Sequence, residues 1–157
     1  MKNKVILILH NVRSVVNVGA IFRIADSAGV SKIYLTGYTP TPLDRFGNKR
    51  RDFHKSALGA EDYIEWEQHK GYSQVLKNMR IKKVKIIALE QRNGSVDYKK
   101  VKVNGPVAII VGNEVKGLSK SILNMADKVA EIPQRGKKES LNVSVALGIF
   151  LFRILNI

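Results

Sequence analysis

A group of polar side chains in the sequence could together bind and activate a ligand. They are Asn17, Arg23, Glu114, Ser140 and Asn142. Amide, carboxylate, hydroxyl and guanidinium groups can hold a substrate by hydrogen bonds and help to move its protons. Singly, each has an ordinary role: Asn17 could cap a helix, and Arg23 could pair weakly with Asp26. We expect all of them to lie in loops or first helical turns that gather at one end of a sheet.

The last part of the chain changes character at Ser140. Before it lies a basic, polar loop, and after it residues 143–155 leave almost no polar face, so we predict a helix that is buried nearly all round. We expect the polar start of this helix, Ser140 and Asn142, to be anchored in the core. Free backbone N–H groups and the positive end of the helix dipole would suit a negatively charged or carbonyl-rich ligand there. The apolar run is shorter than the roughly 20 residues that cross a bilayer, which argues against a membrane span.

The loop GNEVKGLS at 112–119 resembles a phosphate-binding loop without completing it. Its glycines and its serine have the right spacing, but Leu118 stands where a lysine must reach the β and γ phosphates. No G-x-G-x-x-G follows the first apolar run, so the sequence argues against an NTPase and against an ordinary dinucleotide site. Gly112 and Gly117 could let a ligand lie against bare backbone or could serve turn geometry alone, and the sequence by itself favours turn geometry.

Cations alternate with aromatic residues in segment 44–55. They are Arg45, Lys49, Arg50, Arg51, His54 and Lys55, arranged around Phe46 and Phe53. Such a segment could pair with phosphates and stack on unpaired bases. A solvated, mobile loop explains the same composition equally well, and Pro40, Pro42 and Gly47 argue against a long regular element.

The composition favours a basic protein that binds nucleic acid. Lysine and arginine outnumber aspartate and glutamate 27 to 13, a formal net charge of +14, which favours a polyanionic partner over a merely solubilising excess of charge. The absence of cysteine excludes disulfides and thiolate metal sites, and the spacing of His10, His54 and His69 matches no metal motif. The apolar run at 5–9 is too short for a signal peptide, so we predict a cytoplasmic protein without a metal.

Apolar runs and helical periodicities predict a fold that would bring the polar loops together. We predict strands at 5–9, 32–36, 84–89, 107–111 and 128–132, and helices from about residue 17 to 28, at 71–79, at 118–125 and after 140. Runs that are apolar throughout are typical of a parallel sheet covered on both faces. The predicted fold class is therefore α/β, a mostly parallel sheet flanked by helices, and 157 residues fit one domain. Polar loops then follow the carboxyl ends of strands, where such sheets bind ligands.

Three ordered motifs resemble those of the TrmH-like (SpoU) branch of the SPOUT RNA methyltransferases. The first, an asparagine followed six residues later by an arginine, matches NVGAIFR at 17–23. The second, a strand that runs into glycine, a variable residue and glutamate, matches IIVGNEVKGLS at 109–119. The third matches Ile132-Pro133 together with SLNVSVA at 140–146. The likeness covers nearly the whole chain, and the motifs in this order are far more specific than any one of them.

This resemblance implies a SPOUT domain with a deep C-terminal trefoil knot, spanning 1–157 without an N-terminal RNA-binding extension. It implies that S-adenosylmethionine binds, bent, in a pocket of knot loops. The residues matched to that pocket are Leu89, Gly112, Asn113, Gly117, Ile132 and Leu141. It also implies a homodimer that associates through the knot region, with an RNA site shared between the subunits. RNA contacts are then expected from the domain surface, at Arg13, Arg45, Lys49, Arg50, Arg51 and Lys55.

The activity that the resemblance implies is methyl transfer to a ribose 2'-hydroxyl of tRNA or rRNA. Arg23 would act at the hydroxyl with Asn17 fixing it. The remaining site residues, Glu114, Ser140 and Asn142, would orient substrate, loop and cofactor. Because arginine keeps its proton at neutral pH, Arg23 could equally hold the adjacent phosphate and stabilise the alkoxide. The alternatives are an RNA-binding protein of this fold without catalysis and a SPOUT enzyme that methylates a base, and the asparagine-to-arginine motif argues against the base methylase.

Overall fold

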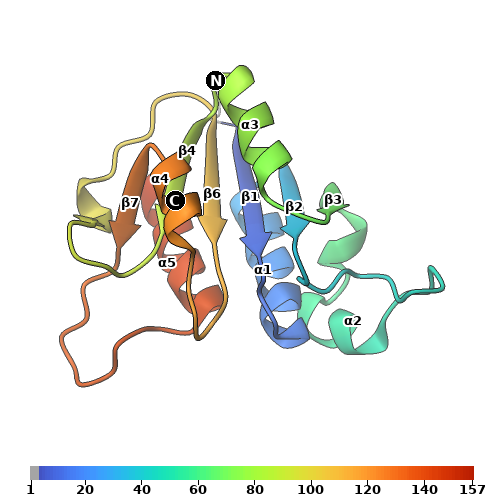
Figure 1. The fold of residues 1–157 in the computed structure, drawn as a ribbon. Helices are drawn as coiled ribbons and strands as arrows, with labels where there is room; N and C mark the ends of the chain where they lie inside the picture. The colour runs from blue at the N-terminus through green and yellow to red at the C-terminus, as the bar shows by residue number, and fades with distance from the viewer. Residues whose placement is uncertain (1–3) are drawn as a thin grey trace.

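A parallel β-sheet forms the centre of the computed structural model, which describes residues 4–157 (Figure 1). Its strands are β1 (Val5–His10), β2 (Lys32–Thr36), β3 (Trp66–His69), β4 (Lys85–Leu89), β5 (Val96–Asp97), β6 (Val107–Val111) and β7 (Lys128–Glu131). They are ordered β3-β2-β1-β6-β4-β7-β5, and each neighbouring pair runs parallel. The predicted α/β class with a mostly parallel sheet is confirmed.

Helices cover both faces of this sheet (Figure 1). They are α1 (Val15–Ala28), α2 (Arg51–Ala57), α3 (Ser73–Ile81), α4 (Lys120–Met125) and α5 (Val143–Leu155), with short 3-10 helices η1 (Ala60–Asp62) and η2 (Tyr98–Lys100). Alternate residues of β1 point to opposite faces. Leu7 and Leu9 pack in a core shared with α1, α2 and α5, whereas Ile6 and Ile8 pack with α3 and α4. The run at 5–9 is apolar throughout because both faces of a central parallel strand are buried.

Every predicted strand is present, with each end within one residue of its expected position. The sequence does not predict β3 or β5, which lie at the two edges of the sheet. β3 carries the exposed residues Glu67 and Gln68, so it has no apolar run that would indicate a strand. β5 has only 2 residues, too few to show a period.

The first helix begins earlier than predicted. α1 starts at Val15 with Ser14 as its N-cap, because the Ser14 hydroxyl accepts a hydrogen bond of 3.2 Å from the Asn17 backbone N–H. Asn17 therefore lies in the first turn and does not cap the helix, which frees its side chain for contacts across the molecule. At the other end, Gly29 adopts the left-handed conformation (φ 71°) that is typical of a glycine after a helix.

The last helix is buried on one side only. Phe150 and Leu151 are fully buried. On the opposite side, Val145, Ile149 and Phe152 are 49%, 40% and 37% exposed. The prediction of burial nearly all round is therefore wrong for the single chain, because the sheet and α1 cover one side of α5 and leave another apolar side open. None of the helices within residues 4–157 is long and apolar enough to cross a membrane.

The polar start of α5 is exposed and not anchored in the core. Ser140 and Asn142 lie at the surface, and the buried polar residue at this end is Ser144, which is 8% exposed. The reason is that Asn142 caps the helix from its outer end, where its Oδ1 accepts hydrogen bonds from the Ser144 backbone N–H and hydroxyl at 2.9 and 2.6 Å. α5 then packs beside α1. The trefoil knot that the resemblance implies stays a prediction.

Candidate active site

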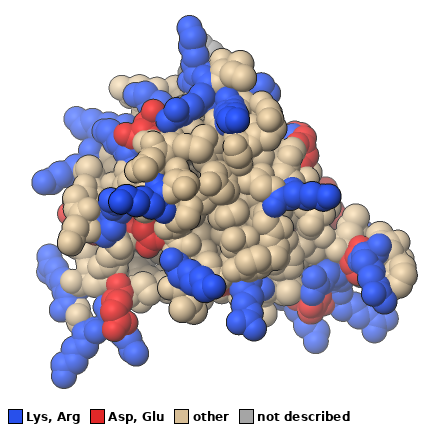
Figure 2. All heavy atoms as spheres, viewed as in Figure 1, with Lys and Arg blue, Asp and Glu red and all other residues tan. Residues whose placement is uncertain are grey.

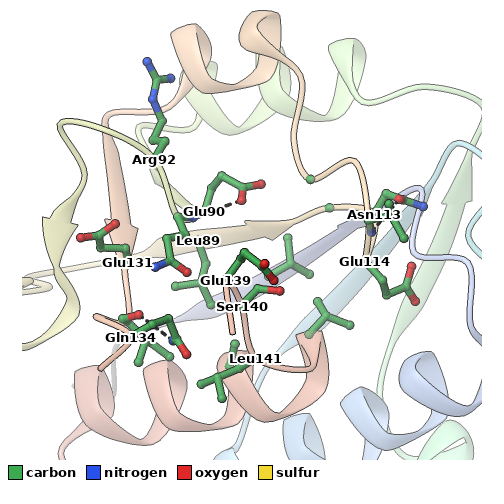
Figure 3. A pocket seen from close by; sticks show the side chains of 18 of the residues that line it. Leu89, Glu90, Arg92, Asn113, Glu114, Glu131, Gln134, Glu139, Ser140 and Leu141 are labelled. Atoms are coloured by element: carbon green, nitrogen blue, oxygen red, sulfur yellow. Dashed lines mark hydrogen bonds between the residues drawn. The ribbon is translucent and has the colours of Figure 1, made fainter. Parts of the chain in front are cut away.

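A cavity of about 730 Å³ lies at the carboxyl ends of β4, β6 and β7 (Figure 3). Its walls are the loops that follow these strands and the segment that leads into α5. The lining residues include Leu89, Gly112, Asn113, Gly117, Ile132 and Leu141, together with Glu114 and Ser140. All the residues matched to the cofactor thus surround one hollow, although they come from separate segments of the chain.

Close approach of the backbone explains the glycines in the loop after β6. A Cβ atom on Gly112 would lie 2.7 Å from the Gly117 carbonyl oxygen and from the Leu118 side chain. Gly117 has a φ of +66°, and a Cβ there would overlap the Glu90 carboxylate. The Asn113 side-chain oxygen fixes the turn by accepting hydrogen bonds from two backbone N–H groups of the loop, at 2.9 and 2.8 Å. Turn geometry therefore accounts for both glycines, and it fixes the loop at the edge of the cavity.

Glu90 joins the loops that follow β4 and β6, a role that we did not predict. Its Oε2 accepts a hydrogen bond of 2.8 Å from the Leu118 backbone N–H, and its Oε1 accepts one of 3.1 Å from the Gln91 N–H. Glu90 also lines the cavity (Figure 3). Its position in the sequence could have indicated this role, because it directly follows the buried run that ends at Leu89, where such sheets begin their ligand-binding loops.

A chain of hydrogen bonds connects the segments that carry the three motifs. Glu114 Oε1 accepts a hydrogen bond of 3.0 Å from Asn17 Nδ2, and Asn17 Oδ1 accepts another of 3.0 Å from Asn142 Nδ2. Glu114 also accepts hydrogen bonds from the backbone N–H groups of Arg13 and Ser14, both at 3.0 Å. Because Asn142 caps α5, this chain ties the loop after β6 to the starts of α1 and α5.

Hydrogen bonding keeps the Glu114 carboxylate ionised. Burial by itself raises the pKa of Glu114, but the hydrogen bonds from the Arg13 and Ser14 backbone and from the Asn17 side chain outweigh it, so this pKa lies below its ordinary value. The cause is that these N–H donors bind the charged form of the carboxyl better than the neutral form. Glu114 is thus a fixed negative charge beside the cavity and is poorly suited to accept a proton.

Arg23 lies apart from this network in the single chain. Within residues 4–157, the lining of the cavity does not include Arg23. It is exposed in the third turn of α1, roughly 9 Å along the helix axis from Asn17, and it lines a second hollow of about 380 Å³ with Phe152 of α5. The ion pairs of the described chain do not join it to Asp26. The expectation that all the polar site residues gather at one end of the sheet is therefore wrong for Arg23, because the helix carries its later turns away from that end.

The residues predicted to contact RNA differ in their surroundings. Lys49 forms an ion pair of 2.8 Å with Asp62, and Arg50 forms one of 2.7 Å with Asp52, so carboxylates partly neutralise both charges. Of the six predicted RNA contacts, four are exposed and pair with no carboxylate of the described chain: Arg13, Arg45, Arg51 and Lys55. Figure 2 shows Lys and Arg side chains spread over the visible face, with a group over α2 at lower right.

The histidines do not converge on a common site. Each has its own hydrogen-bond partner: His10 with Thr36, His54 with Glu61, and His69 with Glu67. Among residues 4–157, no group of three or more His, Asp or Glu side chains could hold a metal ion.

Comparison with known proteins identifies the family. A family model described as the SpoU rRNA methylase family matches residues 4–152. The chain belongs to the SpoU rRNA methylase family. The resemblance that the motifs indicate is thereby confirmed, and the match includes all three motifs.

Curated relatives of this chain are RNA methyltransferases by name. The chain is 33% identical over 147 residues to the tRNA (guanosine(18)-2'-O)-methyltransferase of Aquifex aeolicus, covering 94% of this chain and 66% of the relative. It is 32% identical over 154 residues to the 23S rRNA (guanosine-2'-O-)-methyltransferase RlmB of Blochmanniella floridana, covering 96% of this chain and 58% of the relative. The chain thus spans little more than half the length of some relatives.

Solved structures of related proteins have the same fold as this chain. The AdoMet-bound rRNA methyltransferase from Sinorhizobium meliloti matches this chain with a TM-score of 0.87 at 30% identity, over 99% of this chain and 57% of that one. The TrmH/SpoU tRNA modifying enzyme of A. aeolicus matches with a TM-score of 0.85 at 29% identity, over 99% of this chain and 76% of that one. These likenesses confirm the predicted SPOUT class of fold.

Proposed function

We propose that this chain transfers the methyl group of S-adenosylmethionine to a ribose 2'-hydroxyl of tRNA or rRNA. The observation that carries the proposal is the shared cavity, because the residues matched to the cofactor line it together with Glu114 and Ser140. Family membership supports the chemistry, since relatives are named as guanosine 2'-O-methyltransferases of tRNA and of 23S rRNA.

The cavity suits a bent, cationic methyl donor by its size and lining. Its volume of about 730 Å³ lies within the range of about 300–1,000 Å³ that is typical of small-molecule sites. Leu89, Ile132 and Leu141 offer apolar surface for a nucleoside ring. Glu90 and Glu131 place carboxylates around a ligand that carries a positive sulfur. When bound there, the donor would supply an activated methyl group, and a related rRNA methyltransferase from S. meliloti is described as AdoMet-bound.

The polar network supports a fixed environment for a ribose hydroxyl. A ribose hydroxyl is a weak nucleophile, so the site must hold it in attack geometry and assist the loss of its proton. Ser140 lines the cavity just before α5, and we assign its hydroxyl to contact the ribose. We assign Asn17, Glu114 and Asn142 to positioning, because each is already engaged in hydrogen bonds within the protein.

A homodimer would bring Arg23 to this site. Arg23 lies next to the open apolar side of α5, since it lines a hollow with Phe152. Val145, Ile149 and Phe152 leave that side exposed, which is typical of a surface covered by a second copy. Arg23 of a second copy would then hold the phosphate beside the target ribose and stabilise the forming alkoxide. The proton would leave to a phosphate oxygen or to water.

Charge supports RNA as the substrate. The chain carries a formal net charge of +14, which draws it to polyanions. The Arg13 backbone N–H donates a hydrogen bond to Glu114, which lines the cavity. Arg13 is exposed near the cavity, and we assign its guanidinium to a phosphate of the bound RNA. Arg51 and Lys55 extend the positive surface over α2.

The test is transfer of a tritiated methyl group. The protein is incubated with methyl-tritiated S-adenosylmethionine and with tRNA or rRNA from cells that lack it, and the RNA is then digested to nucleosides. We expect the label in a 2'-O-methylnucleoside. Label in a base would assign the chain to base methylation, and RNA binding without label would leave a binding protein of this fold. Either result would overturn the proposal.

A further inference from the structure

The turn at residues 43–49 projects from the body of the protein beside α2 (Figure 1). A β-bridge pairs its two ends. Inside it, the Asp44 N–H donates to the Asn48 carbonyl at 2.8 Å, and the Gly47 N–H donates to the Asp44 carbonyl at 3.0 Å. Gly47 has a φ of +82°, a conformation that glycine adopts without steric cost. The 43–49 turn is therefore a defined structure, which argues against the mobile loop that its composition also allowed.

Side chains fix the 43–49 turn from within and from the side. The Asp44 carboxylate accepts hydrogen bonds from the backbone N–H groups of Asn48 and Phe46 at 2.9 and 2.8 Å, and hydrogen bonds from these two residues hold the pKa of Asp44 below its ordinary value. Lys49 is joined to Asp62 of η1 by an ion pair of 2.8 Å. The tip of the turn is thus oriented before any ligand arrives.

An aromatic ring and a cation occupy this tip. Phe46 is 73% exposed, and the Arg45 guanidinium lies over its ring, 4.7 Å from the centroid. The neighbouring residues Asp44, Asn48 and Lys49 are polar and exposed, so the ring is not part of an apolar patch. A fixed ring beside a cation and polar neighbours suits a planar ligand with a negative charge better than it suits an apolar protein surface.

We propose that the 43–49 turn binds one unpaired nucleotide of RNA, with the base stacked on Phe46 and the phosphate held by Arg45. This inference rests on the proposed function, in which RNA is the substrate. Stacking would add affinity without reading sequence, because every base has a π-face. Nearby charge supports the same ligand, since Arg51 and Lys55 of α2 are exposed and pair with no carboxylate within residues 4–157.

Within one subunit, the 43–49 turn lies away from the reaction cavity. It follows β2, whereas the cavity lies at the ends of β4, β6 and β7. In the sheet, β1 separates β2 from β6. Relative to the cavity of its own subunit, the stacked nucleotide is therefore distinct from the methylated one.

This inference is tested by comparing the binding of two short, unstructured RNA oligomers. One is intact, and the other has the same length and charge but carries abasic ribose units, so it cannot stack. Fluorescence anisotropy should show that the protein binds the intact oligomer about tenfold more tightly than the abasic one. Phe46→Ala should bind both oligomers alike, and Phe46→Trp should restore the preference. Ile81→Ala is the matched control, because it removes an apolar side chain that is 78% exposed on α3, and it should behave as the unchanged protein.

Salt dependence separates stacking from charge. Phe46→Ala should leave the slope of log affinity against log salt unchanged. Arg45→Gln should make this slope shallower, by the amount that corresponds to about one phosphate contact. If Phe46→Ala keeps the preference for intact RNA, the inference fails while RNA binding and methyl transfer stand. If the unchanged protein binds neither oligomer although it takes up the methyl donor, this inference and the RNA part of the proposed function fail together.

Discussion

Asn142 Nδ2 donates a hydrogen bond of 3.0 Å to Asn17 Oδ1, which joins the beginnings of α5 and α1. Each of these amides also uses its other atom: Asn142 Oδ1 caps α5, and Asn17 Nδ2 donates to Glu114. Both amides are therefore oriented by their partners at each end. These hydrogen bonds connect the loop after β6 to the starts of α1 and α5, and we propose that they position the site.

Removing either amide should cost stability, and removing both should reveal their coupling. Asn142→Ala loses the cap of α5, which is worth about 1 kcal/mol, as well as the hydrogen bond to Asn17. A double-mutant cycle with Asn17→Ala should give a coupling free energy of about 0.5–1.5 kcal/mol. Urea unfolding of the parent, the single variants and the double variant measures it. Strictly additive effects would show that the Asn17–Asn142 bond contributes nothing.

Acid should weaken the fold through Glu114. Its pKa is lowered in the folded protein, so its contribution to the free energy of unfolding is complete above the unfolded pKa of about 4.3 and is lost as the pH falls through the folded pKa. Glu114→Gln should lower that free energy by about 1–3 kcal/mol at neutral pH, because one amide oxygen cannot accept the bonds that two carboxylate oxygens accept. The deficit should shrink below about pH 4. The free energies of unfolding of the parent and of Glu114→Gln are measured between about pH 3 and 7. A difference that stays constant with pH would contradict the role of the ionised Glu114.

A side chain at Gly117 should damage both the fold and the cavity. Gly117→Ala should cost about 1–2 kcal/mol, because its φ of +66° is left-handed and its Cβ would displace the Glu90 carboxylate. Donor affinity should fall in the same variant, since Glu90 lines the cavity. Gly136→Ala is the matched control, because a Cβ there meets nothing within 4 Å. Thermal unfolding and donor titration of both variants check this, and equal behaviour of the two would mean that the loop tolerates a side chain.

A charge on the open side of α5 should separate the proposed homodimer. Ile149→Glu would place a carboxylate in an apolar contact, where an unpaired charge costs far more than in water. We expect monomers in sedimentation velocity and loss of methyl transfer, because Arg23 would no longer reach the cavity of a second copy. Ile81→Glu, at an exposed apolar position of α3, should change neither property. An Ile149→Glu protein with unchanged mass and activity would exclude this face as the interface.

Local pattern predicts the strands well where burial is complete. The runs at 5–9 and 107–111 are apolar throughout and are buried in central strands. The edge strand β3 is missed, because its exposed Glu67 and Gln68 give no apolar signal. The open side of α5 shows the opposite error. Val145 and Ile149 are as apolar as core residues, and composition alone does not say whether the same chain or another covers them.

The sequence also predicts some features of the site and misses others. The residues proposed to bind the cofactor were predicted from ordered motifs that resemble a family, and the fold brings them to one cavity because each ends a parallel strand, follows one or leads into α5. Sequence spacing gives the distance of Arg23 along α1 from Asn17, but it does not place Arg23 relative to a cavity built from other segments. Glu90 was missed because its role lies in a contact with the Leu118 backbone, far along the chain.

Calorimetric titration of the protein with S-adenosylmethionine shows whether the cavity binds the methyl donor, with Gly112→Val and Gly136→Ala titrated in parallel. A side chain at Gly112 would meet backbone at 2.7 Å inside the loop that lines the cavity, whereas Gly136 has open space around it. We expect saturable uptake by the parent and by Gly136→Ala, and its loss in Gly112→Val, with all three proteins folded by circular dichroism. No uptake by the parent, or equal uptake by Gly112→Val, would contradict the assignment of this cavity to the methyl donor.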